Sequence, residues 1–123
     1  MRTILTIAAL ILIAGGVLVW NATRLPDKFG DFTGAPQADV ADVVARPQQY
    51  LHKTVLLEGE VRKQCTTMGC YFFFPAGRHY LRVDLADVAM NAPRREGHHA
   101  RVEGQVVPYN DAYQFWASAV EFK

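Results

Sequence analysis

Two cysteines, Cys65 and Cys70, are the residues of this chain best suited to covalent chemistry. Four residues separate them, so a turn can bring their Cα atoms within the ~4.4–6.8 Å that a disulfide needs, provided that the compartment is oxidising. Catalytic thiol–disulfide exchange is not expected, because such sites place Cys-x-x-Cys at the start of a helix, which lowers the pKa of the attacking thiol. We therefore expect a structural disulfide that joins the strands on either side of the loop.

A metal site is the alternative use of the same loop. The thiolates of Cys65 and Cys70, with the thioether of Met68 between them, would suit a soft ion such as Cu(I). His79, at the start of a following strand, is a further candidate ligand. A zinc site has less support, because no second ligand pair follows at the usual spacing. The two uses exclude each other, since a metal site needs both thiolates and a disulfide leaves none.

An aromatic run of Tyr71, Phe72, Phe73 and Phe74 follows the second cysteine directly. Successive side chains of a strand point to opposite faces, so two of the four should lie inside the fold and two outside. The outer pair, with Tyr80, Tyr113 or Trp116, would form a patch that docks a protein. The whole run is therefore a candidate for interaction.

The sequence contains no recognisable Ser–His–Asp set, carboxylate pair or phosphate-binding loop. We therefore expect that the protein is not an enzyme and holds no cofactor. Its formal net charge is +1, whereas nucleic-acid binders normally carry a strong basic excess. No nucleic-acid partner is expected.

The first apolar segment begins at Ile4 and ends at Trp20, and it contains no charged residue. As a helix it would be about 25 Å long, near the lower limit for crossing a bilayer. Cleavage of a signal peptide after Ala22 would require a small residue where Trp20 stands, whereas tryptophan suits the interface of a retained anchor. We expect residues 1–22 to be a transmembrane anchor with a cytoplasmic N-terminus; a cleaved signal peptide is the alternative.

Small residues form two pairs seven positions apart in this segment. Ala8 with Gly15, and Ala9 with Gly16, would lie on one side of a helix. Small residues let two membrane helices approach closely, so this stripe would dock a helix of a membrane protein. The plainer alternative is that small residues are common in membrane segments.

Residues 23–38 are rich in proline and glycine and lack apolar periodicity, so we interpret them as a linker or a surface loop. Residues 39–123 are the expected folded domain. A short helix begins after Asp39, which can cap it, and ends before Pro47. Alternating apolar residues then predict five strands, at residues 54–63, 70–74, 79–85, 100–107 and 113–122.

The first and fourth of these strands carry a glycine in a similar context, Gly59 in VLLEGEV and Gly104 in ARVEGQV. A glycine weakens a strand but lets a long strand coil sharply, as a small barrel requires. Residues 86–93 would be a short helical or irregular crossover. We therefore predict an all-β fold, a five-stranded OB-type Greek-key barrel with one N-terminal transmembrane helix, in preference to an open sheet.

The stretch from Val40 to Phe122 resembles a family of small exported bacterial OB-fold proteins of unknown function. The matching motifs are ADVVARP at 41–47, KTV at 53–55, EGEV at 58–61, CTTMGCY at 65–71 and VEG at 102–104. The Cys-x-x-Met-Gly-Cys-aromatic core is the most specific of them. The resemblance implies an OB fold and an envelope location, and it implies no established activity.

A weaker likeness is to the membrane-anchored haem chaperone of cytochrome c maturation, which is also a helix followed by an OB barrel. That chaperone carries a haem-binding histidine, followed by a tyrosine, near the end of the barrel. This chain has no histidine after His99, so haem carriage is not expected.

These features predict a non-catalytic accessory subunit in the inner (cytoplasmic) membrane, with one membrane span and its OB domain in the periplasm or outside. Its expected partner is an integral membrane protein or complex that it binds or stabilises. The alternative is an envelope protein that handles copper or another metal with Cys65, Met68 and Cys70.

Overall fold

The computed structural model of the protein describes residues 27–65 and 70–123. The predicted anchor at residues 1–22, with Ala8, Ala9, Gly15, Gly16 and Trp20, lies outside the described residues. Within the two described ranges, no helix is both long and apolar enough to cross a membrane.

The described chain is mostly β-structure, so the predicted all-β class is confirmed. Its elements are β1 (Lys28–Gly30), α2 (Val40–Ala45), the 3-10 helix η1 (Pro47–Tyr50), β2 (Thr54–Glu60), β3 (Tyr71–Ala76), β4 (His79–Asp84), β5 (His99–Tyr109) and β6 (Ala112–Phe122). The five predicted strands correspond to β2 through β6. Residues 86–93 form turns and irregular backbone.

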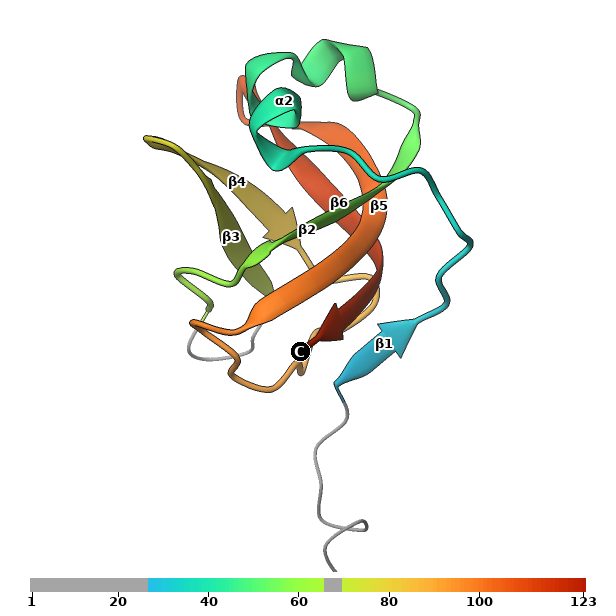
Figure 1. Cartoon of the computed structure of the whole chain (residues 1–123), viewed down its shortest axis with the longest axis vertical. Helices are drawn as coiled ribbons and strands as arrows, with labels where there is room; N and C mark the ends of the chain where they lie inside the picture. The colour runs from blue at the N-terminus through green and yellow to red at the C-terminus, as the bar shows by residue number, and fades with distance from the viewer. Residues whose placement is uncertain (1–26, 66–69) are drawn as a thin grey trace, which may run out of the picture.

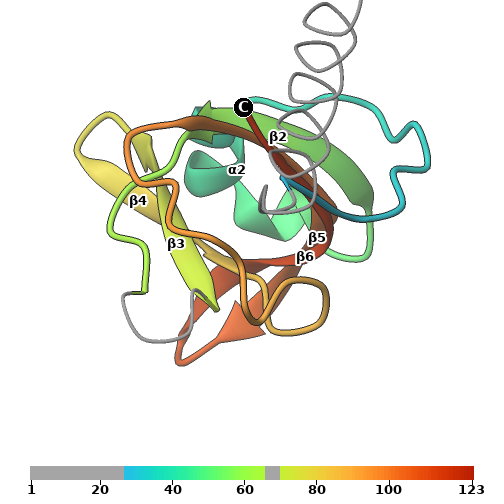
Figure 2. The ribbon, with the colours of Figure 1, turned by 90° about the horizontal axis from the view of Figure 1, so that it is seen from below.

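The six strands belong to one curved sheet in the order β2-β5-β6-β4-β3, with β1 paired to β6 (Figure 1). All pairs are antiparallel except β4 with β6, which is parallel. The helix α2 lies at one end of the curved sheet (Figure 1), and in the view from below it is seen inside the outline of the strands (Figure 2). The buried side chains of Val40 and Val43 pack this helix into the core with Phe72, Phe74 and other apolar residues of the sheet.

The sheet does not close, which corrects the predicted barrel. In the described chain its end strands are linked by one bridge beyond the end of β2, where the amide of Arg62 donates to the carbonyl of Phe73 at 2.9 Å and the amide of Phe73 donates back at 2.8 Å. The same antiparallel register would next place Pro75 opposite Glu60. Because proline has no N–H to donate, the pairing cannot continue in that direction.

Gly59 and Gly104 lie where neighbouring groups leave no room for a side chain. A Cβ at Gly59 would lie 2.7 Å from Cδ1 of Phe74, and a Cβ at Gly104 would lie 2.1 Å from the carbonyl oxygen of Trp116. The register of β5 against β6 also shifts between Glu103 and Gly104. A shift of this kind bends the strand, so Gly104 stands at a bend, as the sequence pattern suggested.

Part of the predicted linker belongs to the fold. Residues 28–30 form β1, which pairs with residues 119–121 of β6. Farther along, the amide of Ala38 donates to the carbonyl of Leu56, and the amide of Leu56 donates to the carbonyl of Pro36, both at 2.9 Å. Between these two attachments the chain turns at Gly34, whose φ of 79° favours glycine. The folded unit therefore begins well before residue 39.

Candidate functional site

The aromatic run divides between the core and the outer surface. Phe72 and Phe74 are fully buried and pack against each other, with ring centroids 5.1 Å apart. Tyr71 and Phe73 point to the other face of β3 and are half-buried. The alternation agrees with the prediction, but Phe72 and Phe74 are core residues, so their assignment to the interaction surface is wrong.

Tyr71 and Phe73 belong to a row of six side chains on the outer face of the β3–β4 hairpin, which we call the aromatic–cation ladder. In spatial order its members are Lys63, Tyr80, Phe73, Tyr71, Arg82 and Tyr109. Each contacts the next. The Lys63 ammonium lies 4.1 Å from the centroid of the Tyr80 ring, and the Arg82 guanidinium carbon lies 4.2 Å from the centroid of the Tyr71 ring.

The rings of the ladder meet edge to face. The ring centroids of Tyr80 and Phe73 are 6.3 Å apart, and those of Phe73 and Tyr71 are 6.0 Å apart. Tyr80 is 46% exposed and Tyr109 is 38% exposed, both high values for large aromatic side chains. Edge-to-face and cation–π contacts are each worth about 0.5–1 kcal/mol, enough to hold these exposed side chains in one arrangement.

Two turns supply the ends of the ladder. Lys63 follows β2 with a φ of 49°, which is unusual for a lysine and directs its side chain over the hairpin. Asn110 and Asp111 have φ values of 42° and 55° and form the two-residue turn between β5 and β6. Asparagine and aspartate tolerate that conformation, and the turn places Tyr109 against Arg82.

The two cysteines are thiols in the structure, so the predicted disulfide is not formed. The amide of Cys65 donates to the carbonyl of Tyr71 at 3.0 Å, and the side chains of Cys65 and Cys70 are in hydrogen-bonding contact. Burial, and next the hydrogen bond with Cys65, raise the pKa of the Cys70 thiol. The raised pKa disfavours the thiolate that must attack for a disulfide to form.

Of the predicted metal ligands, the structure brings Cys65 and Cys70 together and places His79 away from them. His79 pairs with Ala76 at the tip of the β3–β4 hairpin, whereas Cys70 lies just before the base of β3. Six residues of strand separate those two levels, which is roughly 20 Å. Met68 lies outside the described residues, and within residues 27–65 and 70–123 no group of three or more His, Cys, Asp or Glu side chains is placed to hold a metal. The inclusion of His79 is therefore wrong.

The sequence patterns did not indicate that the carboxylate of Glu103 is buried. Glu103 of β5 is 1% exposed, and it accepts hydrogen bonds from the amide of Thr33 at 3.0 and 3.1 Å, from the Thr33 hydroxyl and from the amide of Ala35 at 3.4 Å. Burial opposes ionisation, but these bonds and one from the Gly34 amide outweigh it and lower the pKa of Glu103. The VEG motif gave no signal of this contact, because the donors lie about 70 positions earlier in the chain.

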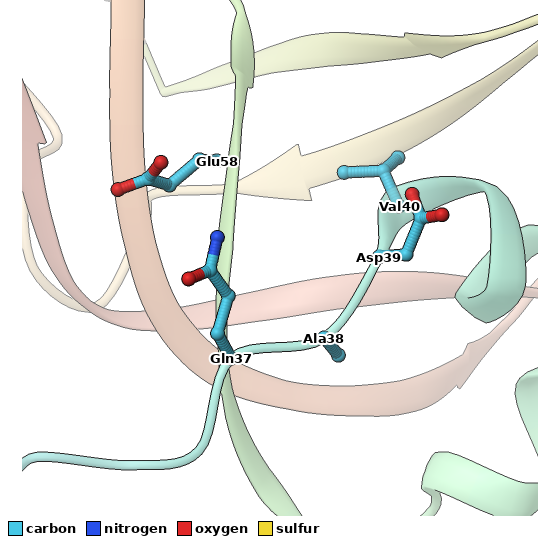
Figure 3. Close-up of a pocket in the computed structure, with 5 residues that line it drawn as sticks. All are labelled: Gln37, Ala38, Asp39, Val40 and Glu58. Carbon is cyan, nitrogen blue, oxygen red and sulfur yellow. The ribbon is translucent and has the colours of Figure 1, made fainter.

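The hollow drawn in Figure 3, of about 460 Å³, lies between β2 and the chain leading into α2. Its acidic groups already have structural partners. Asp39 caps α2 by accepting from the amide of Ala41 at 3.1 Å. Glu58 lies 3.4 Å from the Arg101 guanidinium and 3.8 Å from the Lys123 ammonium. The hollow is therefore a weaker candidate for recognition than the exposed ladder.

Neither a family model nor a curated protein matches this chain. Among solved structures, the hypothetical protein ygiW from E. coli matches with a TM-score of 0.53 and 12% sequence identity, over 76% of this chain and 99% of that one. A "putative aspartyl-tRNA synthetase" from Leishmania major Friedlin matches with a TM-score of 0.47 and 16% identity, over 89% of this chain and 26% of that one. The likeness to ygiW places this chain among small β proteins with an OB-like fold.

Proposed function

We propose that this protein is a non-catalytic accessory protein of a bacterial envelope, which binds an integral membrane protein or complex through the aromatic–cation ladder. The segment from Ile4 to Trp20 would hold it in the inner membrane, and the β domain would lie on the periplasmic side. In this proposal the chain belongs to the exported OB-fold family that its Cys-x-x-Met-Gly-Cys-aromatic core resembles.

The ladder is the observation that carries this proposal. Tyrosine and arginine are enriched at the centres of protein interfaces, where a few such residues supply most of the binding energy. A monomeric protein rarely exposes a connected set of large aromatic side chains without a use for it. The contacts among the six side chains also fix their arrangement before binding, which lowers the entropy lost on association.

The test places a photo-crosslinking amino acid, benzoylphenylalanine, at Tyr80 of the full chain in native membranes. One discrete membrane-protein adduct is expected from Tyr80 and none from Met90, an apolar side chain of similar exposure outside the ladder (49% against 46%). Tyr80→Ala should weaken co-purification of that partner about 30-fold, the size of an interface hot spot, and Met90→Ala should leave it unchanged. Recovery of a free monomer with no adduct from Tyr80 would overturn the proposal.

Metal handling is the second candidate, and the contact between the Cys65 and Cys70 side chains is the observation that favours it. Its test is metal analysis of the full chain, purified from the envelope without chelators, beside the Cys65→Ser, Cys70→Ser double variant. Bound copper in the wild type that is missing from the double variant supports metal handling. Metal-free protein with two reactive thiols and intact partner binding rules against it.

A further inference from the structure

We infer that the segment of the partner that docks on the ladder is acidic, and that one of its carboxylates binds the guanidinium of Arg82. This inference rests on the proposed function and adds to it the chemistry that the partner must present.

The guanidinium of Arg82 contacts two tyrosine rings and a glutamine side chain. Its carbon lies 4.2 Å from the ring centroid of Tyr71 and 4.8 Å from that of Tyr109. Its Nε donates a 2.9 Å hydrogen bond to Oε1 of Gln114, whose side chain is itself almost buried. These three contacts hold the guanidinium in place before any partner arrives.

Both Nη atoms of this guanidinium have N–H groups available to a ligand. Its Nη2 lies 3.7 Å from Oδ2 of Asp84, beyond hydrogen-bonding distance, while Oδ1 of Asp84 accepts from the amide of Ala86 at 2.9 Å. Among the described residues, Nη1 of Arg82 makes no hydrogen bond, and the side chain stays 22% exposed. A planar carboxylate can take two parallel hydrogen bonds from a guanidinium, the arrangement in which arginine binds carboxylates most strongly.

The other end of the ladder is also positively charged. Lys63 is exposed over the Tyr80 ring, and within the part of the chain that the structure describes it has no carboxylate within ion-pair distance. The ladder thus carries two cations, at Lys63 and Arg82, against the single carboxylate of Asp84. Charge complementarity favours an acidic segment lying along the hairpin and opposes a basic one.

The test is a double-mutant cycle on the full chain in nanodiscs with the partner captured at Tyr80. Arg82→Gln should weaken binding about 30-fold or more, the range for truncating one member of a desolvated, hydrogen-bonded charge pair. Arg82→Lys should recover only part of the affinity, because an ammonium cannot make the paired contact. Arg78→Gln, which removes an exposed arginine from the β3–β4 turn, is the matched control and should leave binding unchanged.

The second arm changes the partner and leaves this chain intact, so a folding defect of an Arg82 variant cannot obscure the result. Each aspartate and glutamate of the crosslinked segment is replaced by its amide. One replacement should weaken binding as much as Arg82→Gln, and combining the two should cost no more than either alone. A captured partner with no carboxylate coupled to Arg82 overturns this inference and leaves the proposed function standing, whereas adducts to lipid alone overturn both.

Discussion

At the scale of single residues, Glu103 shows how a charge is kept inside this small protein. Its carboxylate is buried, and an unpaired buried charge would cost several kcal/mol. Here three consecutive amides and one hydroxyl of residues 33–35 surround it, so the ionised form is favoured. The same bonds attach the N-terminal part of the fold to the centre of β5.

This carboxylate predicts how stability depends on pH. The pKa of Glu103 in the folded protein lies below its usual value of 4.5, so the charged group stabilises the fold fully above pH 4.5, and that contribution is lost as the pH falls through the folded-state pKa. Glu103→Gln should lower the free energy of unfolding by about 1–3 kcal/mol at neutral pH and flatten its decline in acid. Denaturant titrations from pH 7 to pH 3 measure both effects.

Glu96→Gln is the control for that series, because Glu96 is exposed in a turn. This variant should keep the neutral stability and the acid decline of the wild type. An equally steep decline in Glu103→Gln and in the wild type would show that other groups control the acid sensitivity.

At the scale of the strands, the two glycines predict unequal costs for the same substitution. The Cβ of Gly59→Ala would meet the edge of a Phe74 ring at 2.7 Å, and a ring can shift. The Cβ of Gly104→Ala would meet the backbone oxygen of Trp116 at 2.1 Å, and two hydrogen-bonded strands shift less easily. Gly59→Ala should therefore cost about 1–3 kcal/mol, the range for overpacking, and Gly104→Ala should cost more.

Thermal and denaturant unfolding of both variants measure this difference. Gly34→Ala is a useful comparison, because a Cβ there meets nothing within 4 Å and the variant carries only the cost of a φ of 79°. A larger loss for Gly59→Ala than for Gly104→Ala would mean that the β5–β6 contact is looser than the structure has it.

The sequence predicted those elements whose causes are local. Asp39 and Pro47 mark the ends of the segment that contains α2, and apolar alternation located β2 through β6. The ladder was predicted only in part, as an outward pair of aromatics. The two cations of the ladder are Lys63, beyond the end of β2, and Arg82. Arg82 reaches the rings of β3 because β3 pairs with β4, and Tyr109 lies against Arg82 because of the turn that follows it.

Three of the errors share one physical cause, because they depend on how strands pair with one another. β1 is held by backbone hydrogen bonds to β6, which leave no side-chain pattern to read. The distance between His79 and Cys70 depends on hairpin register, and the open sheet depends on which strand residue faces Pro75. In each case the residue types and their spacing were interpreted correctly, but they do not show which strand residue lies opposite which.

At the scale of the whole molecule, the described chain begins and ends at one place. The amide of Phe122 donates to the carbonyl of Asp27 at 2.8 Å, and in Figure 1 the start of β1 and the C-terminus lie at the same end of the domain, opposite α2. A membrane anchor placed before residue 27 would therefore join the domain at the end away from α2. The base of the β3–β4 hairpin lies toward that end as well (Figure 1), whereas Tyr80, near the tip, lies beside α2.

The extent of the folded unit gives the last prediction. A chain that starts at Asp27 keeps β1 and the residues that surround Glu103, so it should unfold cooperatively as one domain. A chain that starts at Asp39 has the boundary expected from composition, but it lacks β1 and the donors that surround the Glu103 carboxylate. The deletion removes the β1–β6 pairing, the backbone bonds of Pro36 and Ala38 with Leu56 and the bonds to Glu103. Each hydrogen bond contributes about 0.5–1.5 kcal/mol, so the shorter chain should be strongly destabilised or unfolded in circular dichroism melts at neutral pH. Equal melting temperatures for the two chain lengths would show that residues 27–38 are a linker that does not stabilise the fold.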